Sequence, residues 1–284
     1  MVGIDGTLGS LTAITHRAGV TENNELVTTS TPEGLAVARG LIPGITAVNK
    51  FGASPDVDNN QITDLWDFTA GSIYNYQTSG IPLYMVSTAI PDSPTIQIQG
   101  LNERGEQTTV SQQVTSGRTP VLIGSDIGST FLWYRVFRGL ITSATPQFGN
   151  ISIYESGTVS TGVVDDRLKV KAYLSSGTFP ANQTRMALYT IPSGKTGYIK
   201  SLYGNLVNNT AAVIDYKLFV RPSGGVFNIK YESVIDSNAN STWQHIYSVP
   251  LKIEPLSDIK INVRSDTTNT AVAGGFDIII VNGS

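Results

Sequence analysis

The chain has 284 residues, a formal net charge of −3 and 14% charged residues, where average proteins have about 25%. This length suggests one large domain or two ordinary ones, and without a basic surplus we expect no binding to nucleic acid. Cysteine is absent, which excludes disulfides, thiolate metal sites and cysteine nucleophiles and fits folding in a reducing cytosol.

Residues 1–38 are expected to form an extended N-terminal arm, with one short helical turn at 31–40. The start of the chain lacks the basic residues and apolar run of a secretory signal, and no apolar stretch approaches the roughly 20 residues that span a bilayer. Apolar residues in the arm follow no period of 2 or 3.6, so the arm would bury little surface by itself. Two interpretations stay open: a mobile terminus, or an extension that orders against a neighbouring subunit.

Residues 39–155 are expected to form a first β-rich unit. Its clearest feature is a hairpin at 95–114, where Ile96 and Ile98 alternate with glutamines and Gly105 supplies the loop. The second arm of this hairpin alternates with a phase slip at Gln112. A short helical turn is also expected at 60–68. The remaining strand candidates are 44–52, 72–77, 83–90, 131–141 and 150–154.

Residues 156–166 are rich in Gly, Ser and Thr and are expected to be a linker. A second unit follows at 167–284, with a hairpin turn at 221–225. In its first strand candidate, Lys169 and Lys171 point away from the apolar face. The strand candidates of this unit are 167–174, 186–192, 197–207, 215–221, 226–235, 245–253, 259–264 and 276–281. The spacing predicts an all-β fold of two tandem antiparallel β-sandwich (jelly-roll-like) domains.

The stretch DVDNNQITDLWD at 56–67 raises the question of a metal loop. Its oxygen-bearing side chains fall at the ligand positions of a helix-loop-helix calcium site. Position 6 lacks the usual glycine, position 12 is an aspartate in place of a glutamate, and Pro55 disfavours an entering helix. We interpret the stretch as a turn-rich entry that Trp66 and Phe68 anchor to the core. The candidate ligands are Asp56, Asp58, Asn60, Asp64 and Asp67.

Other chemical motifs are weak. His16 and His245 lie far apart, and no Gly-x-Ser-x-Gly elbow supports a catalytic triad. The acid pair Asp165 and Asp166 falls in the proposed linker and is read as a solvated boundary. The Gly-Lys-Thr run at 194–196 lacks the earlier glycine of a phosphate-binding loop, so it is read as a turn between strands. We therefore expect no catalytic, cofactor-binding or metal-binding residues.

Three segments carry a family resemblance. RGLIPGITAVNKFGASPDVDNNQITDLWDF at 39–68 resembles the segment that opens many virion structural proteins of tailed bacteriophages. TIQIQGLNERGEQ at 95–107 is similar to the hairpin that follows in those proteins. MALYTIPSGKTGYIKSLYGNL at 186–206 resembles a recurrent element of the same family. The resemblance covers residues 39–206 with gaps, implies a particle component without enzyme activity, and does not extend to the arm.

The expected function is that of a virion structural protein, made in the host cytoplasm without export. Capsid decoration, cement or a head–tail collar is favoured, and a tail or fibre component is the alternative. Expected partners are other virion proteins and further copies of the chain, with no nucleic acid and no membrane. A host-glycan-binding module and a carboxylate-based hydrolase are the hypotheses from other classes. The aromatic candidates for sugar binding are Tyr74, Tyr76, Trp133 and Trp243, each of which is also suited to the core.

Overall fold

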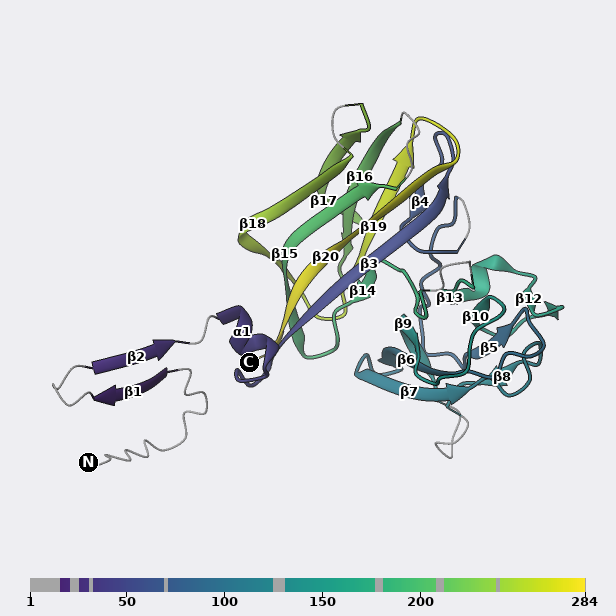
Figure 1. Ribbon diagram of the computed structural model, residues 1–284, viewed down its shortest axis with the longest axis horizontal. Coiled ribbons are helices and arrows are strands. Elements are labelled where there is room, and N and C mark those ends of the chain that lie inside the picture. Colours follow the sequence, from purple (N-terminus) through teal and green to yellow (C-terminus); the bar gives the residue numbers. More distant parts are fainter. Residues whose placement is uncertain are drawn as a thin grey trace.

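The computed structural model confirms the all-β class and consists of two β-sandwiches and an N-terminal hairpin (Figure 1). It describes residues 16–20, 26–30, 33–68, 71–124, 131–176, 181–207, 212–238 and 241–283. Across these segments no helix has the length and hydropathy needed to cross a membrane.

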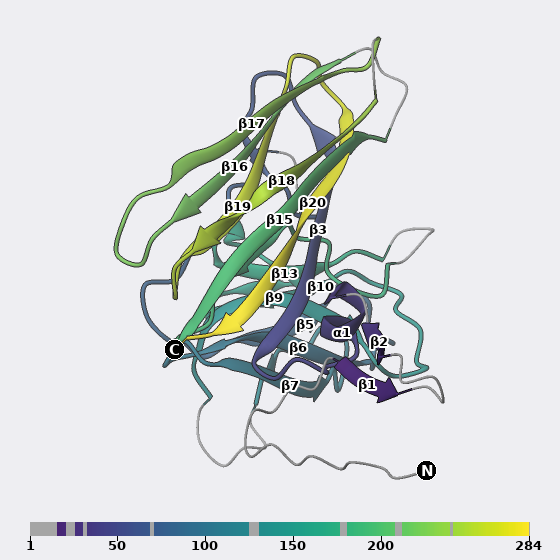
Figure 2. The same ribbon diagram turned by 90° about the vertical axis from the view of Figure 1, so that its left-hand side faces the viewer.

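One sandwich, here called the host sandwich, is built from both ends of the described chain. Its first sheet has the order β18-β15-β20-β3 (Figure 2), with bounds Thr242–Ile253, Lys195–Leu206, Thr270–Asn282 and Ile45–Val57. Its second sheet has the order β14-β19-β16-β17, with bounds Leu188–Thr190, Asp258–Ser265, Val213–Arg221 and Asn228–Asp236. The short β4, Thr63–Asp64, also pairs with β19.

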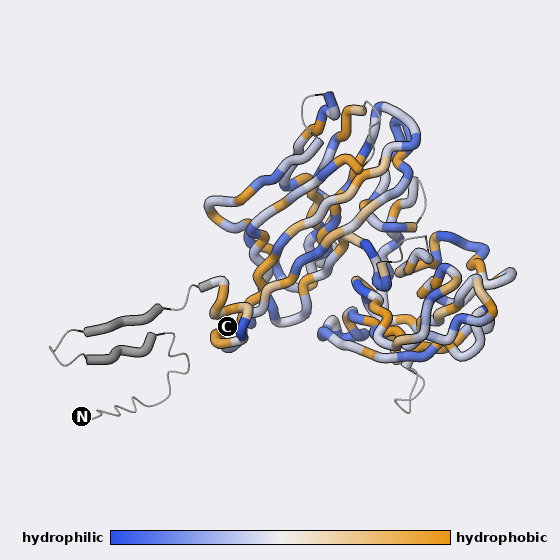
Figure 3. The backbone as a smooth tube through the Cα atoms, viewed as in Figure 1, coloured by the Kyte–Doolittle hydropathy of each residue, from blue (hydrophilic) through white to orange (hydrophobic). Residues whose placement is uncertain are grey.

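Burial alternates along strands of the host sandwich, and the tube in Figure 3 shows apolar and polar residues interspersed along them. In β16 the residues Ile214, Tyr216, Leu218 and Val220 are all buried, while the residues between them are half-exposed. They meet the inward face of the other sheet in one core that includes Phe276. Burying such side chains contributes about 1.5–3 kcal/mol each, so this alternation is the main determinant of which face turns inward.

The other sandwich, here called the inserted sandwich, occupies the middle of the chain. One sheet has the order β13-β10-β5-β8, with bounds Val170–Leu174, Ile151–Tyr154, Tyr84–Ser87 and Val121–Leu122. The other has the order β7-β6-β9, with bounds Gln107–Gln113, Thr95–Asn102 and Trp133–Ile141. A small hairpin, β11 and β12, and a 3₁₀ turn, η2, precede β13, with bounds Val159–Ser160, Val163–Val164 and Arg167–Lys169.

The strand pairing divides the chain differently from the predicted units at 39–155 and 167–284. β3 pairs with β20 over its whole length, from Ile45 opposite Val281 to Val57 opposite Thr270. β13 pairs with β10 of the inserted sandwich. The predicted linker at 156–166 carries β11 and β12, and its Val164 is buried in the core of the inserted sandwich. The inserted sandwich is therefore placed within the host sandwich, because β3 finds its partner at the far end of the chain.

The chain leaves and re-enters the host sandwich through two segments that run side by side, here called the neck. The Ala187 amide donates to the Leu65 carbonyl at 2.8 Å, and Trp66 forms a β-bridge with Met186. Gly52 of β3 lies against this crossing. A Cβ atom at Gly52 would lie 2.1 Å from the Leu65 carbonyl oxygen and 2.6 Å from the Ala187 nitrogen.

Several local predictions can be compared with these elements. The hairpin at 95–114 is present as β6 and β7, with Gly105 at a φ of +75°. The phase slip at Gln112 was wrong: the register is continuous, and Gln112 points inward with its Oε1 accepting from the Gly124 amide. Each strand candidate from 186 to 281 corresponds to one of β14 to β20. The Gly225 amide donates to the Pro222 carbonyl at 2.9 Å in the turn between β16 and β17.

Two other local predictions were wrong, and one lysine expected to point away from the apolar face is nevertheless buried. The helical turn expected at 60–68 is absent, because Leu65 donates to the Ile261 carbonyl of β19 at 2.8 Å and so extends beside that strand. Residues 72–77 form no strand, and the Tyr74 amide donates to the side chain of Asp64 at 2.7 Å. Lys171 is buried, with its Nζ 3.0 Å from the Asn75 carbonyl oxygen.

The arm predicted at 1–38 contains an antiparallel hairpin and a short helix. β1, His16–Val20, pairs with β2, Leu26–Ser30. The helical turn expected at 31–40 is present as α1, Glu33–Ala38. Residues 1–15, 21–25 and 31–32 lie outside the described residues. Figure 1 shows the hairpin standing away from both sandwiches, while α1 lies beside the start of β3.

Because two backbone segments lie close to Gly52, we predict that a single added methyl group there lowers the stability of the fold. Gly52→Ala forces a side chain into two backbone segments, so we expect a loss of about 1–3 kcal/mol in the free energy of unfolding. Gly34→Ala is the matched control, because a Cβ there meets nothing within 4 Å and alanine favours the helix by about 0.5–1 kcal/mol. Urea denaturation of both variants measures the difference. Equal stability of the two variants would contradict the close approach at the neck.

Candidate functional site

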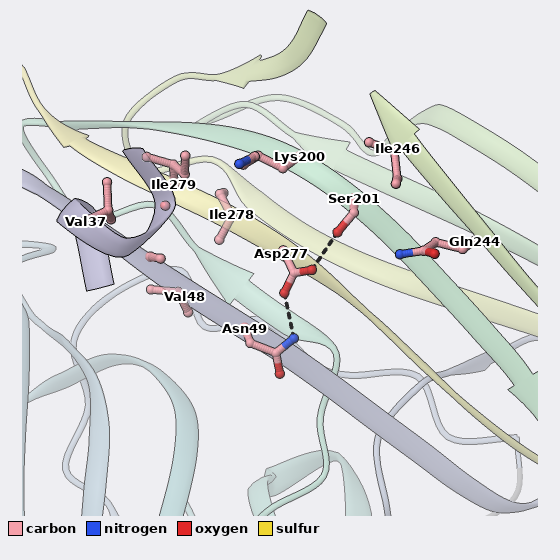
Figure 4. A pocket seen from close by; sticks show the side chains of 12 residues that line it. Val37, Val48, Asn49, Lys200, Ser201, Gln244, Ile246, Asp277, Ile278 and Ile279 are labelled. Carbon is pink, nitrogen blue, oxygen red and sulfur yellow. Dashed lines mark hydrogen bonds between the residues drawn. The ribbon is translucent and has the colours of Figure 1, made fainter. Parts of the chain in front are cut away.

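A groove of about 550 Å³ lies on the outer face of the β18-β15-β20-β3 sheet, next to α1 (Figure 4). Strand register positions its floor. Asn49 of β3 lies opposite Asp277 of β20, which lies opposite Ser201 of β15, which lies opposite Ile246 of β18. These residues belong to the alternate set that points away from the host core, so four strands present one continuous row at this face.

The polar side chains of the groove floor bind one another. Asn49 Nδ2 donates to Asp277 Oδ1 at 2.8 Å and to the Tyr203 hydroxyl at 2.9 Å. Ser201 Oγ donates to the other carboxylate oxygen of Asp277 at 2.5 Å (Figure 4). Both carboxylate oxygens thus have a donor from a different strand. This network fixes the floor and satisfies it internally.

The walls of the groove are mainly apolar. Val37 from α1 and Ile279 from β20 lie at one end, and Ile246 lies at the other with 68% of its surface exposed (Figure 4). His245, adjacent to Ile246, points to the opposite side of the sheet and stacks on Tyr231 with ring centroids 4.2 Å apart. Ser201 therefore has a carboxylate but no histidine beside it. Among the described residues that line the groove, none forms a base–nucleophile pair.

Two aspartates of the acidic stretch at 56–67, Asp64 and Asp67, pair with cations of the protein itself, while a buried oxygen of Asp56 has no hydrogen-bond partner among the described residues. Asp64 is fully buried, with Lys260 Nζ at 2.9 Å and Asn262 donating to it. Burial raises the pKa of Asp64, and Lys260 opposes that rise. Asp67 accepts two hydrogen bonds from Arg185, at 2.9 and 2.5 Å, across the neck. Among the residues that the structure describes, no three His, Cys, Asp or Glu side chains gather where they could hold a metal ion.

The expected anchoring of this stretch by aromatic residues is confirmed. Trp66 is buried in the core of the inserted sandwich, and the Phe68 ring packs on it with centroids 4.9 Å apart. Asp166 accepts a hydrogen bond from the Leu168 amide and caps the 3₁₀ turn, while Asp165 is exposed beside it.

The remaining candidates are also engaged structurally. The Gly-Lys-Thr run forms the turn from β14 into β15, with Lys195 Nζ 2.7 Å from Asn282 Oδ1. The aromatic candidates for sugar binding do not form an exposed platform. Tyr74 and Trp133 are buried, while Tyr76 and Trp243 pack partly buried against the two cores. The side chain of His16 lies outside the described residues.

Sequence reasoning missed a buried charge cluster between the two sandwiches, here called the inter-sandwich cluster. Its centre is Asp258 of the host strand β19, whose side chain is 4% exposed. Arg135 of the inserted strand β9 donates to both carboxylate oxygens, at 2.9 and 3.1 Å. Arg221 donates to Oδ2 at 2.6 and 3.0 Å, and Thr190 to Oδ1 at 2.6 Å. The Tyr76 ring lies near both guanidinium groups.

No local signal identified this cluster. Asp258, Lys260 and Asn262 alternate with buried isoleucine and valine residues, which is the pattern of a solvent-facing strand surface. Arg135 of the inserted sandwich covers Asp258, and Asp64 of β4 covers Lys260 and Asn262, so segments remote in the sequence bury these polar residues.

A second buried cation joins the sandwiches without a carboxylate. Lys50 of β3 reaches from the host sandwich, and its Nζ donates to the Phe137 carbonyl of the inserted strand β9. The side chain is enclosed, and burial together with the charge of Arg138 holds the pKa of Lys50 well below its usual range.

Comparisons with known proteins are sparse. No family model matches the chain, and no curated protein matches it. A structure of infectious bursal disease virus, Gx strain, is similar at 10% identity, covering 84% of this chain and 73% of that chain, with a TM-score of 0.24. The VP2 subviral particle of infectious bursal disease virus is similar at 10% identity, covering 94% and 63%, with a TM-score of 0.23. At these TM-scores the likeness carries no argument about fold or function.

The inter-sandwich cluster predicts that Arg135 is essential to stability. Arg135→Ala removes one of the two guanidinium partners of a buried carboxylate, so we expect a loss of about 3–5 kcal/mol in the free energy of unfolding. Arg104→Ala, in an exposed turn, is the control and should change it by no more than about 0.5 kcal/mol. Chemical denaturation measures both. A loss for Arg135→Ala as small as that of the control would show that the cluster does not hold the sandwiches together.

Lys50 predicts a specific dependence of stability on pH. Because its pKa is lower in the folded chain, the unfolded chain binds more protons, and stability should rise with pH below the ordinary lysine pKa of 10.5. The slope should approach about 1.4 kcal/mol per pH unit where Lys50 is deprotonated only in the folded state. Denaturation of the wild type and of Lys50→Met from pH 7 to 9.5 isolates this contribution by difference. Lys200→Met, at an exposed lysine, should retain the wild-type slope, and retention of that slope in Lys50→Met would refute the assignment.

Proposed function

We propose that this protein is a non-enzymatic structural component of a tailed-phage virion, assembled by protein–protein contacts as a capsid decoration or cement protein or as part of a head–tail collar. Its partners are other virion proteins and further copies of itself. The observation that carries the proposal is the structural role of the residues that resemble the phage family. They join the two sandwiches and perform no evident chemistry.

The resembling segment at 39–68 illustrates this use. Lys50 and Gly52 lie where β3 meets the inserted sandwich and the neck. Trp66 anchors the neck in the core, and Asp67 pairs with Arg185 across it. Because the resemblance to the phage proteins falls on residues that connect the two sandwiches, it supports an architecture shared with those proteins. Such a likeness is expected of a structural component.

The surfaces favour the same role. The groove floor has no base–nucleophile pair, and the inter-sandwich cluster is enclosed by protein. A hairpin that stands away from the body is a means of contact with a neighbour (Figure 1). Many copies of one modest contact reinforce each other in a repeated shell or tail.

Cosedimentation tests the role. Purified protein is mixed separately with empty heads and with isolated tails of the phage that encodes it, and bound protein is measured in the pellet. We expect binding to heads, and binding to tails alone would place the protein in the tail. Absence of binding to both, with absence of the chain from purified virions by mass spectrometry, would refute a virion role.

A further inference from the structure

The β1–β2 hairpin has no cover in the described part of the chain. It forms a two-stranded sheet of its own, with an unpaired edge on each side. An isolated two-stranded hairpin is at best marginally stable in water, because it buries too little surface. Unpaired strand edges also favour pairing with another chain. The hairpin therefore has the properties of an element that is completed by a partner.

The groove on the host sandwich is the complementary surface, and it adjoins the base of the hairpin. Gly34 and Val37 of α1 line it, and α1 follows β2 after only two residues. Its far wall, Ile246, lies on β18, whose outer edge has no partner strand in the described sheets. Ile246 is 68% exposed, so this apolar side chain on the edge strand β18 is also uncovered in the described part of the chain.

We propose that the β1–β2 hairpin of one copy lies in this groove of a second copy, so that copies of the chain are joined by exchange of their N-terminal arms. The inference deepens the proposed assembly role by naming the contacting surfaces. The polar floor is already satisfied by Asn49, Asp277 and Ser201. Lys200 and Gln244 also line the groove, so the arriving hairpin contacts its apolar walls and these two polar side chains.

The connection between hairpin and body favours a second copy over the same chain. Two residues separate β2 from α1, so the Cα atoms of Ser30 and Glu33 lie within about 11 Å of each other. From there the strands point away from the body (Figure 1). Each strand has five residues, or about 17 Å. The hairpin thus extends away from α1, which forms one wall of its own groove, toward the side on which a neighbouring copy would lie.

Cross-linking tests which groove the hairpin enters, and the chain has no cysteine to interfere. Thr28→Cys and Gln244→Cys are made in separate full-length proteins with different tags, mixed and mildly oxidised. We expect a disulfide-linked heterodimer. Thr28→Cys mixed with Ser223→Cys, at an exposed turn of the host sandwich, is the control and should give little product. Equal yields in the two mixtures would overturn the proposal, and so would a dilute double variant, Thr28→Cys with Gln244→Cys, that closes only within one chain.

A pair of charge substitutions tests the groove itself by sedimentation velocity. Ile246→Lys replaces an apolar wall of the groove by a second cation beside Lys200, while Val234→Lys adds a cation on the outer face of the other host sheet, where the valine is 55% exposed. We expect self-association to weaken by about tenfold or more for Ile246→Lys and to be unchanged for Val234→Lys. A wild-type protein that stays monomeric at high concentration, or an Ile246→Lys variant that associates normally, would overturn the arm exchange. Cosedimentation of the wild type with heads is scored independently, so failure of the exchange is distinct from failure of the virion role.

Discussion

The arrangement of the whole molecule depends on one buried carboxylate. Asp258 belongs to the host sandwich, and it accepts a bidentate pair of hydrogen bonds from Arg135 of the inserted sandwich. Removing such charges from water is costly, and their attraction offsets the cost only in good geometry. Sliding or rotating one sandwich against the other would leave a buried charge without its partner. The pair therefore selects one docking of the two units, even if it adds little net stability.

This rigid docking separates two kinds of surface. On the outer face of β19, Asp258 pairs with Arg135 of the inserted sandwich, and Lys260 pairs with Asp64 of the neighbouring β4. The outer face of the opposite host sheet is left open, with its polar floor satisfied from within and its walls apolar. A body whose own units are fixed in this way can present the open face to a neighbour at a constant angle.

The sequence predicted which face of each strand is buried better than it predicted which strands pair with each other. Alternation in 186–281 located every strand of the host sandwich in that range, because a period of two reports which side of a strand is dry. The same pattern does not state which strand lies alongside. β3 and β20 are more than 200 residues apart in the chain, so their pairing and the resulting insertion have no local signal.

The acidic stretch at 56–67 shows a related limit. Its spacing resembled a metal loop, but Asp64 and Asp67 meet Lys260 and Arg185, which are remote in sequence. Trp66 was placed correctly because a large aromatic residue after a turn has few alternatives to the core. The candidate groove could not be predicted, because it is formed by the register of four strands and by a helix that rests beside them.

The insertion also sets an order of events during synthesis. A ribosome delivers the N-terminal part of a chain first, and domains generally fold as units as they emerge. All strands of the inserted sandwich have appeared with β13, and its core is complete once Leu188 has been added, well before β20 is made. β3 cannot form its hydrogen bonds to β20 until that last strand has been synthesised. The nascent chain thus carries one finished domain and one unpaired strand, and a chaperone that shields β3 would act in this interval.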